Sequence, residues 1–426
     1  MTARRFMVVD WSVLMYLNWH KMRSPNFESR TGLELAEFAR NISAHALYLV
    51  ERVKPDVLVL AVDAPKNWRS DVYARYYLHN VDFREYREKA GIWVVQFDRK
   101  TYLVTYRQDM GKWEFKKLPK ADVLALELED PTQWRTWSSC PVEPAEDLEE
   151  GEEPVRWVQE SKDWPALEPL VPKYKGNRSS SRWDYETPKA EFKVLGANLA
   201  MNLAGTLGGT AVQVEQAEGD DVVATFVGMA PEAAEVVLVS IDSDLHQLLI
   251  DRPDLRIFDP KAHRWVEKSA DLALFEVTHK VLTGDTSDNI AGVSLVGAAA
   301  TLGDKGAEKV ISDNGGPAGV WDYLRGTKDA AGNWIRKPAA DQAPLDRNVE
   351  LVLLDRIPAD LVHQIQDALV PAMAAAAPAV FTFEDAGLTA ADVFSARTMG
   401  RADKELDEGL RDGDPITHET LGKATP

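Results

Sequence analysis

The stretch "DVLVLAVD" (56–63) is a short, valine-rich apolar run that ends at an aspartate, Asp63. Two other runs have the same form: "RFMVVD" ends at Asp10, and "EVVLVSID" ends at Asp242. Continuous apolar runs of this length are typical of strands buried on both faces, as in a parallel sheet that helices cover. The three runs therefore predict a parallel sheet whose strands carry an aspartate at or near their carboxyl ends.

The segments between and after these runs have helical patterns, namely 33–53, 186–207, 220–229 and 244–250. Alternating strands and helices predict a doubly wound α/β domain. In open α/β sheets, ligands bind beyond the carboxyl ends of the strands. We therefore expect Asp10, Asp63 and Asp242 to meet at one edge of the sheet.

The overall composition is that of a globular protein. The chain has 426 residues, of which 45% are hydrophobic and 27% are charged, so it is long enough for two or three domains. No run approaches about 18 apolar residues, and the N-terminus lacks a long apolar segment, so we expect neither a membrane span nor a signal peptide. A single cysteine, Cys140, excludes an internal disulfide and a thiolate zinc cluster, and fits a reducing cytoplasm.

The net charge of −19 argues against a nucleic-acid partner, because phosphate binding needs clustered Lys and Arg. The charge is uneven, however. Residues 141–170 hold ten acidic and two basic residues, a local net of −8, whereas residues 173–193 hold six basic and three acidic residues, a net of +3. The whole-chain value therefore conceals a basic segment.

Residues 80–170 interrupt the α/β pattern. Apolar and polar residues alternate over 91–118, with "DMG" at a bend, which predicts a β-hairpin; the acidic run after it is typical of a solvated linker. We expect four parts: a core of 1–79 and 171–275, a β-rich and acidic insertion of 80–170, a helical region of 276–360, and a partly flexible C-terminal extension of 361–426.

Nine acidic residues stand out: Asp10, Asp63, Glu218, Asp220, Asp221, Asp242, Asp244, Asp285 and Asp288. Any one of them could simply cap a helix or end a strand. As a set they suggest more, because a spacing of three brings Glu218 and Asp221 to one face of a helical start. The same spacing separates Asp285 from Asp288 in "LTGDTSDNIAGV" (282–293), where no basic residue stands nearby in sequence.

Converging carboxylates need cations. Two unit charges about 5 Å apart repel by about 3 kcal/mol at an effective dielectric near 20, so several such pairs would take up protons unless metal ions lay among them. Oxygen ligands without His or Cys select Mg²⁺ or Mn²⁺. Two such ions can activate water and stabilise the leaving oxygen in phosphodiester hydrolysis. An EF-hand calcium loop at Asp285–Asp288 is excluded by its spacing.

Six motifs, taken together and in order, resemble the 5′-nuclease family: flap endonucleases, bacteriophage 5′–3′ exonucleases and the N-terminal nuclease domain of bacterial DNA polymerase I. They are "VVDWS", "AVDAPKNWR", "YKGNR", "AEGDDVVA", "SIDSDLHQLL" and "LTGDTSDNIAGV". The resemblance covers roughly residues 1–75 and 171–315. The last three motifs are specific in combination, since each matches at several positions.

The resemblance implies a PIN-like or Rossmann-like nuclease core of parallel strands with a helical arch near 173–193. It implies two Mg²⁺ or Mn²⁺ ions held by all nine acids, with Asp10 and Asp63 in the catalytic set. Lys175 and Arg178 of the arch would contact phosphates near the scissile bond, Tyr174 would stack on a base, and Arg69 would also contact DNA.

The helical region 276–360 would be a helix–hairpin–helix that grips duplex DNA, with a K⁺ ion at its hairpin. The family's Pro-Gly is replaced here by Ser294-Leu295. The segment "TLGDKGAEKV" (301–310) fits the hairpin and second helix if about seven residues are inserted before it. That register puts Gly303 and Lys305 at the hairpin.

A second departure is that about a hundred residues separate Arg69 from Lys175, which in the family lie close together. We hypothesise that the insertion screens non-substrate duplex or recruits a partner protein. The sequence thus predicts a 5′–3′ exonuclease or 5′-flap endonuclease, acting on DNA with a 5′ end or 5′ flap. We expect a monomer in the cytoplasm of a bacterial host, serving bacteriophage replication or repair.

Two alternatives stay open. One is a PIN-type ribonuclease or an RNase H-like activity, and "YKGNR" argues against the PIN type, which lacks the arch lysine. The other is a DNA-junction binder that does not cut. The full acidic set argues against a pure binder, which gains nothing from repelling phosphates.

Overall fold

The computed structural model of the chain describes residues 4–22, 33–78, 82–85, 92–97, 100–107, 112–119, 135–136, 174–175, 189–298, 300–329 and 332–374. The chain divides into two compact units. The first comprises Met1–Trp68, Ser179–Gly284 and Gly292–Pro426, and the second comprises Arg69–Arg178 and Asp285–Ala291. Arg178, the acidic run 141–170, most of the expected arch and the tail after 374 lie outside the described residues.

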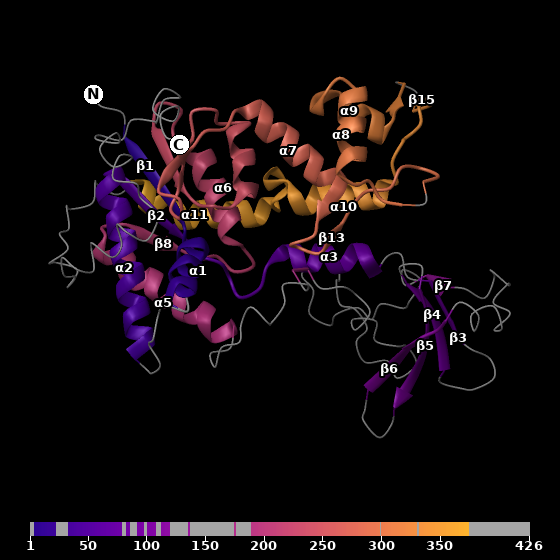
Figure 1. Cartoon of the computed structure of the whole chain (residues 1–426), viewed down its shortest axis with the longest axis horizontal. Coiled ribbons are helices and arrows are strands. Elements are labelled where there is room, and N and C mark those ends of the chain that lie inside the picture. Colours follow the sequence, from indigo (N-terminus) through magenta and orange to yellow (C-terminus); the bar gives the residue numbers. More distant parts are fainter. Residues whose placement is uncertain are drawn as a thin grey trace, which may run out of the picture. The chain divides into compact units, whose positions relative to one another are not determined.

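The first unit is built on a six-stranded sheet of order β11-β10-β9-β1-β2-β8 (Figure 1). Its strands are β1 (Arg5–Asp10), β2 (Val57–Ala61), β8 (Thr210–Val212), β9 (Glu235–Val239), β10 (Arg256–Asp259) and β11 (Arg264–Val266). β1 pairs in parallel with both β2 and β9, and only the edge pair β10–β11 is antiparallel. The predicted α/β fold with a mostly parallel sheet is confirmed.

The three apolar runs are buried on both faces because helices cover both sides of the sheet. α1 (Trp11–Met22), α2 (Leu33–Val53) and α5 (Lys189–Thr206) share a core with one face of β1, β2 and β9. On the other face, α6 (Gly219–Met229) contacts β1 and β2, and α11 (Ala359–Ala374) contacts β2 and β8. The helix predicted over 33–53 has those bounds.

Most of the described residues from 270 to 374 are helical. They form α7 (Ala270–Thr283), α8 (Asp304–Asp313), α9 (Pro317–Arg325), α10 (Gln342–Val352) and η5 (Leu354–Arg356), with a short hairpin of β14 (Thr327–Lys328) and β15 (Trp334–Arg336) between α9 and α10. Buried Asn348 on α10 donates a hydrogen bond to the carbonyl of Val281, which ties α10 to α7. None of the described helices has the length and apolar character needed to cross a bilayer.

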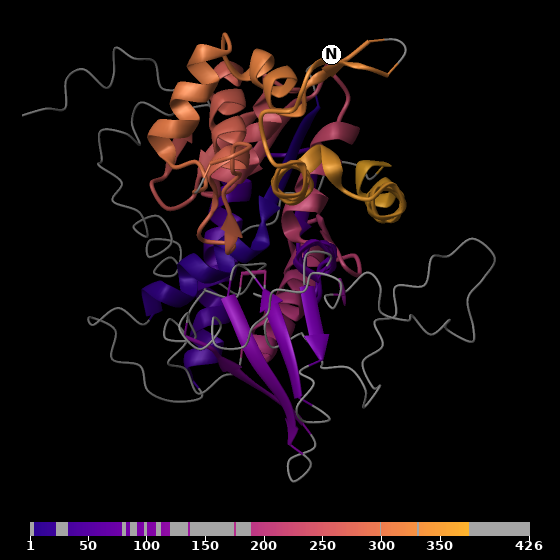
Figure 2. The same cartoon turned by 90° about the vertical axis from the view of Figure 1, so that its right-hand side faces the viewer.

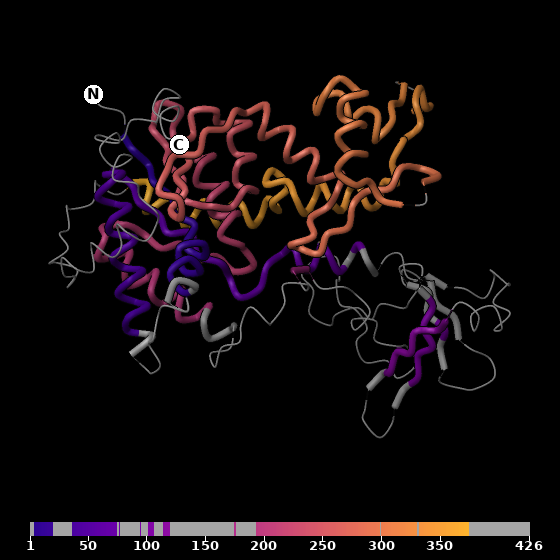
Figure 3. The backbone as a smooth tube through the Cα atoms, viewed as in Figure 1, coloured from indigo at the N-terminus to yellow at the C-terminus, as the bar shows by residue number. Residues whose placement is uncertain are grey.

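The second unit contains nearly all of α3 (Trp68–Leu78), whose backbone Figure 3 traces as a tube, and a five-stranded antiparallel sheet of order β6-β5-β4-β3-β7, whose strands are labelled in Figure 1. Its strands are β3 (Asp82–Glu85), β4 (Ile92–Phe97), β5 (Lys100–Arg107), β6 (Lys112–Lys117) and β7 (Arg135–Thr136). The predicted hairpin is present as β5–β6, and β4 extends it to a meander. Two very short strands, β12 (Gly284–Asp285) and β13 (Ile290–Ala291), pair with each other.

Candidate active site

The strand-end aspartates take up the positions that the apolar runs predict. Asp10 is the last residue of β1 and pairs in register with Ala61, the last residue of β2. Asp63 and Asp242 follow the ends of β2 and β9. Because β1 pairs in parallel with both strands, all three acids belong to the same edge of the sheet.

The electrostatics of Asp10 show that these acids act on one another. Burial, the largest cause, together with the neighbouring charges of Asp63 and Asp242, raises the pKa of Asp10 from 3.8 to about 7. Hydrogen bonds from the Val13 amide (3.1 Å) and the Ser240 hydroxyl (2.9 Å) oppose this rise without cancelling it. A buried carboxylate that two other carboxylates repel favours the binding of a cation beside it.

The N-terminus of α6 lies directly beside Asp63. The Gly219 amide donates to Asp63 Oδ1 at 2.7 Å, and a Cβ at Gly219 would lie only 3.1 Å from that oxygen, so a glycine suits this close approach. Glu218 and Asp221 form a reciprocal capping box around the first turn of α6. Both acids are therefore helix-capping residues as well as candidate ligands, and both are buried.

Two side chains from the preceding segment fix these acids. Asn67 donates to Glu218 Oε1 at 3.0 Å, and Trp68 Nε1 donates to Asp221 Oδ2 at 3.1 Å. Asp220, between them, is half-buried on the same turn. The sequence reasoning missed Asn67 and Trp68, although both belong to the quoted motif "AVDAPKNWR".

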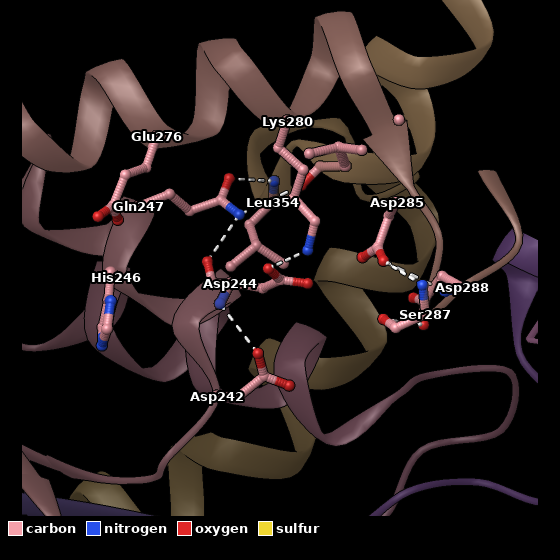
Figure 4. Close-up of polar contacts among 12 residues, drawn as sticks. Asp242, Asp244, His246, Gln247, Glu276, Lys280, Asp285, Ser287, Asp288 and Leu354 are labelled. Carbon is pink, nitrogen blue, oxygen red and sulfur yellow. Dashed lines mark hydrogen bonds and ion pairs between the residues drawn. The ribbon is translucent and has the colours of Figure 1, made fainter. Parts of the chain in front are cut away.

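The corner after β9 carries Asp242 and Asp244. Asp242 is the N-cap of η4 (Ser243–Leu249), a 3₁₀ helix, and its Oδ1 accepts from the Asp244 amide at 2.9 Å (Figure 4). Asp244 forms an ion pair with Lys280 from the last turn of α7. The sequence reasoning also missed Lys280. Lys280 stands five residues before Asp285 in the sequence, but no sequence pattern links it to Asp244.

The turn Asp285–Ala291 belongs to the second unit. Asp285 Oδ1 accepts from the amides of Ser287 (2.7 Å) and Asp288 (3.3 Å), so one carboxylate closes the turn (Figure 4). Both Asp285 and Asp288 are buried. Asn289 adopts a left-handed backbone with φ of 65°, a conformation that asparagine tolerates better than most residues.

Residues of the "YKGNR" motif supply a counter-charge to Asp288, although no basic residue stands within 282–293 in the sequence. Lys175 Nζ lies 3.7 Å from Asp288 Oδ2, and the Tyr174 hydroxyl donates to the same oxygen at 2.9 Å. The Lys175 amide also donates to the Asp288 carbonyl at 2.9 Å. This pairing could not be inferred from the turn itself, because Lys175 is more than a hundred positions away in sequence.

The remaining predicted DNA-binding residues are placed as follows. Gly303 is the N-cap of α8, and Lys305 is exposed in its first turn, at the boundary that the chosen hairpin register predicts. Arg69 is buried on α3. Tyr174 packs against Tyr73 with ring centroids 5.9 Å apart, and the Tyr73 hydroxyl donates to the Asn289 carbonyl.

Whether this site suits a metal ion depends on which side-chain atoms could bind it. Within the described ranges, no three His, Cys, Asp or Glu side chains form a cluster already closed around an ion position. The side chains instead hold one another, the backbone or Lys280. The residues nevertheless suit a hard divalent ion, because Asp10, Asp63 and Asp242 offer oxygens only and the pKa of Asp10 shows their unbalanced negative charge.

Sequence comparison finds similar regions in curated proteins, and no family model matches the chain. The thermostable DNA polymerase I of Thermus thermophilus is 30% identical over 157 residues, which are 35% of this chain and 17% of the polymerase. DNA polymerase I of Mycobacterium bovis is 28% identical over 211 residues, 47% of this chain and 20% of the polymerase. The resemblance to the 5′-nuclease family is confirmed.

A third relative is ribonuclease H of phage T4, 27% identical to the chain over 128 residues, 29% of this chain and 40% of the ribonuclease. This 5′-nuclease-like chain thus spans about a fifth or less of the two polymerases and less than half of the ribonuclease. A bacteriophage T5 protein crystallised with metal ions aligns over 87% of this chain and 99% of its own, at 15% identity and a TM-score of 0.46.

Proposed function

We propose that the chain is a metal-dependent 5′-nuclease, cutting DNA as a 5′–3′ exonuclease or a 5′-flap endonuclease in bacteriophage replication or repair. The observation that carries this proposal is the meeting of Asp10, Asp63 and Asp242 at the carboxyl edge of the sheet, where burial and mutual repulsion raise the pKa of Asp10 to about 7. Buried carboxylates that repel one another lower the stability of the fold, and a divalent cation bound between them offsets this cost.

Divalent ions, two Mg²⁺ or Mn²⁺ in our proposal, would supply charge compensation and activation of water at this site. Asp10, Asp63 and Asp242 would hold them, with Glu218, Asp220, Asp221 and Asp244 around them. The hydrogen bonds from Ser240, Gly219 and Asp244 orient the three strand-end carboxylates. Orientation by such neighbours is what gives a metal site its geometry.

The remaining roles concern the nucleic acid. Lys175 and Arg178 would stabilise charge on the phosphate that is cut, with Tyr174 stacking on a base and Arg69 as a further DNA contact. Gly303 and Lys305, at the start of α8, would meet the duplex backbone near a K⁺ ion. The support is that Gly303 directly precedes the first turn of an exposed, well-formed helix.

The test is cleavage of a 5′-flap DNA substrate labelled at either end, with Mg²⁺, by the full chain and by Asp242→Asn. We expect the wild type to release products from the labelled 5′ strand, and Asp242→Asn to bind the same DNA without cutting it. Asp367→Asn, an exposed acid on α11, is the matched control and should cut normally. Turnover by Asp242→Asn equal to that of the control would disprove the metal-site assignment.

RNA–DNA hybrid is the second substrate to include, because one similar relative is a phage ribonuclease H. Comparing a 5′ DNA flap with a 5′ RNA strand of the same sequence, at equal enzyme, measures which one the site prefers. Asp242→Asn must abolish both activities if a single site performs them.

A further inference from the structure

The β14–β15 hairpin (327–337) is a small, exposed structure with no counterpart among the motifs of the sequence. Thr327 pairs with Arg336 and Lys328 pairs with Trp334, with an irregular register between them. Trp334 is 45% exposed and Ile335 is 71% exposed. Adjacent residues of a strand point to opposite faces, so each face of the hairpin carries one large exposed apolar side chain.

The hairpin has a defined shape that can present these side chains. The Asp329 carboxylate accepts from both the backbone and the side-chain amide of Asn333 across the turn, at 2.8 and 3.2 Å. At the base, Gly326 has a φ of 74°, and a Cβ there would lie 2.6 Å from the Arg336 carbonyl, so the strand enters through a position that only glycine fits. The hairpin is therefore a built element rather than a loose loop.

Hydrogen bonds attach the base of the hairpin to α9. The Ala339 amide donates to the Tyr323 carbonyl at 3.3 Å, and the Gln342 side chain donates to the Leu324 carbonyl at 3.0 Å. α9 in turn contacts α8, which begins at Gly303. Figures 1 and 2 both show the hairpin protruding from this helical part of the first unit.

The charge of the hairpin has the opposite sign to that of the chain. Residues 325–338 contain four basic residues and one acidic residue, a net of +3, whereas the chain carries −19. The single acid, Asp329, is the one engaged in closing the turn. Lys328 Nζ lies 4.5 Å from the centroid of the Trp334 ring, and alternation along β15 puts Arg336 on the same face as Trp334. One face therefore combines two cations with an exposed indole.

We infer that the β14–β15 hairpin is a second nucleic-acid contact, one that lies along the phosphate backbone of duplex DNA. Lys328, Arg336 and Lys337 contact phosphates, and Trp334 packs against the sugar or base edges of the groove. Two-stranded ribbons are a suitable size for DNA grooves, and phosphate contacts of this kind position a protein without reading sequence. The inference rests on the proposed function, since it extends the duplex grip assigned to α8.

The test is binding rather than cutting, measured by fluorescence anisotropy of the full chain with a short blunt duplex in EDTA over a series of salt concentrations. Arg336→Ala should weaken binding and lower the slope of log affinity against log salt by about 1, and Lys328→Ala/Arg336→Ala should lower it by about 2. Arg264→Ala, an exposed arginine on the β10–β11 hairpin, is the matched control and should leave both quantities unchanged.

Trp334→Phe and Trp334→Ala separate the apolar contribution from the charge. Trp334→Ala should weaken binding several-fold without changing the salt slope, and Trp334→Phe should restore most of the loss. Far-UV circular dichroism and the thermal midpoint check that each variant is folded. Unchanged affinity and salt slope in the folded Lys328→Ala/Arg336→Ala variant would overturn the inference. The same result is expected if the hairpin binds another protein and not DNA. Because no divalent ion is present, this result does not depend on whether the chain cuts DNA.

Discussion

The negative charge of two groups of carboxylates in this chain is compensated in different ways. At the sheet edge of the first unit, the carboxylates of Asp63 and Asp242 repel that of Asp10. Burial and this repulsion raise the pKa of Asp10 to about 7. Asp285 and Asp288, in the turn of the second unit, are buried as Asp10 is, but Asp288 has Lys175 and Tyr174 beside it and Asp285 accepts two backbone amides. One group needs an external cation, and the other is largely compensated by the protein.

The difference shows how each group of carboxylates affects the free energy of unfolding. Charges paired within the protein stabilise the fold, and removing one partner leaves the other exposed to a desolvation cost. Charges that repel one another lower the stability of the fold, and that cost is recovered when a metal ion binds. The same kind of residue is thus structural in the turn and poised for ligand binding at the sheet edge.

The largest expected effect comes from Asp10→Asn. We expect cleavage with Mg²⁺ to fall by about a thousandfold or more, while the thermal midpoint of the metal-free protein rises, because the substitution removes a repelled buried charge. Asp288→Asn should instead lower the midpoint, since it leaves Lys175 without its carboxylate. Differential scanning fluorimetry in EDTA and initial cleavage rates measure both. A drop in midpoint for Asp10→Asn would break the comparison.

The second effect is on pH dependence. The folded-state pKa of Asp10 is raised from 3.8 to about 7, so the unfolded chain releases this proton first. The contribution of Asp10 to stability is therefore fully present below about pH 4 and is lost as the pH rises through about 7. Its size is on the order of a few kcal/mol, at about 1.4 kcal/mol for each pKa unit.

Urea unfolding of the wild type and of Asp10→Asn in EDTA, at a series of pH values, isolates this contribution as the difference between the two curves. We expect the variant to lack the loss of stability between about pH 4 and 7. Saturating Mg²⁺ should reduce the loss in the wild type, because the ion binds the ionised form. Parallel curves for the two proteins would contradict the assignment of the raised pKa to Asp10.

The third effect compares the two lysines that pair with candidate ligands. Under the proposed function the charge of Lys175 acts on the reacting phosphate, so Lys175→Ala should reduce the cleavage rate by about ten- to a hundredfold and the duplex affinity much less. Lys280→Ala removes the partner of Asp244 and should lower the Mg²⁺ concentration needed for half-maximal rate, because a competing cation is lost. Rates over a Mg²⁺ titration distinguish the two, and a raised Mg²⁺ requirement in Lys280→Ala would contradict the second expectation.

The smallest effect is expected for Tyr174→Phe, which keeps the ring and removes the hydrogen bond to Asp288. The loss of one bond to a carboxylate should cost about 1–2 kcal/mol of unfolding free energy. If the ring stacks on a base, the cleavage rate should change only a few-fold, whereas Tyr174→Ala should reduce it further. Equal rates for the two variants would argue against a stacking role.

Much of the core fold could be predicted because its signals are local. Buried strands need continuous apolar runs, and the helix over 33–53 follows a clear amphipathic period. The short strands β8, β10 and β11 were not predicted, since three or four residues carry too little pattern. The helix predicted over 244–250 is instead the 3₁₀ helix η4 (Ser243–Leu249), with Asp242 as its N-cap.

The candidate site was predicted less completely than the fold. The strand-end acids followed from the rule that parallel strands end at one edge, and their mutual effect on Asp10 agrees with that reasoning. The partners of the acids were not predicted, because Lys175, Lys280, Asn67 and Trp68 carry no pattern that links them to Asp288, Asp244, Glu218 and Asp221. The β14–β15 hairpin was also missed, since each of its strands is only two or three residues long.

The sequence by itself determined the parallel sheet, the order of the motifs and the nine acidic positions, because apolar periodicity and residue type are properties of neighbouring residues. Only the tertiary structure decided which acids carry a protein counter-charge and which do not. That outcome depends on distances between residues such as Lys175 and Asp288, which lie over a hundred positions apart and meet only when the chain folds. Repulsion at the sheet edge and compensation in the turn are both products of that folding.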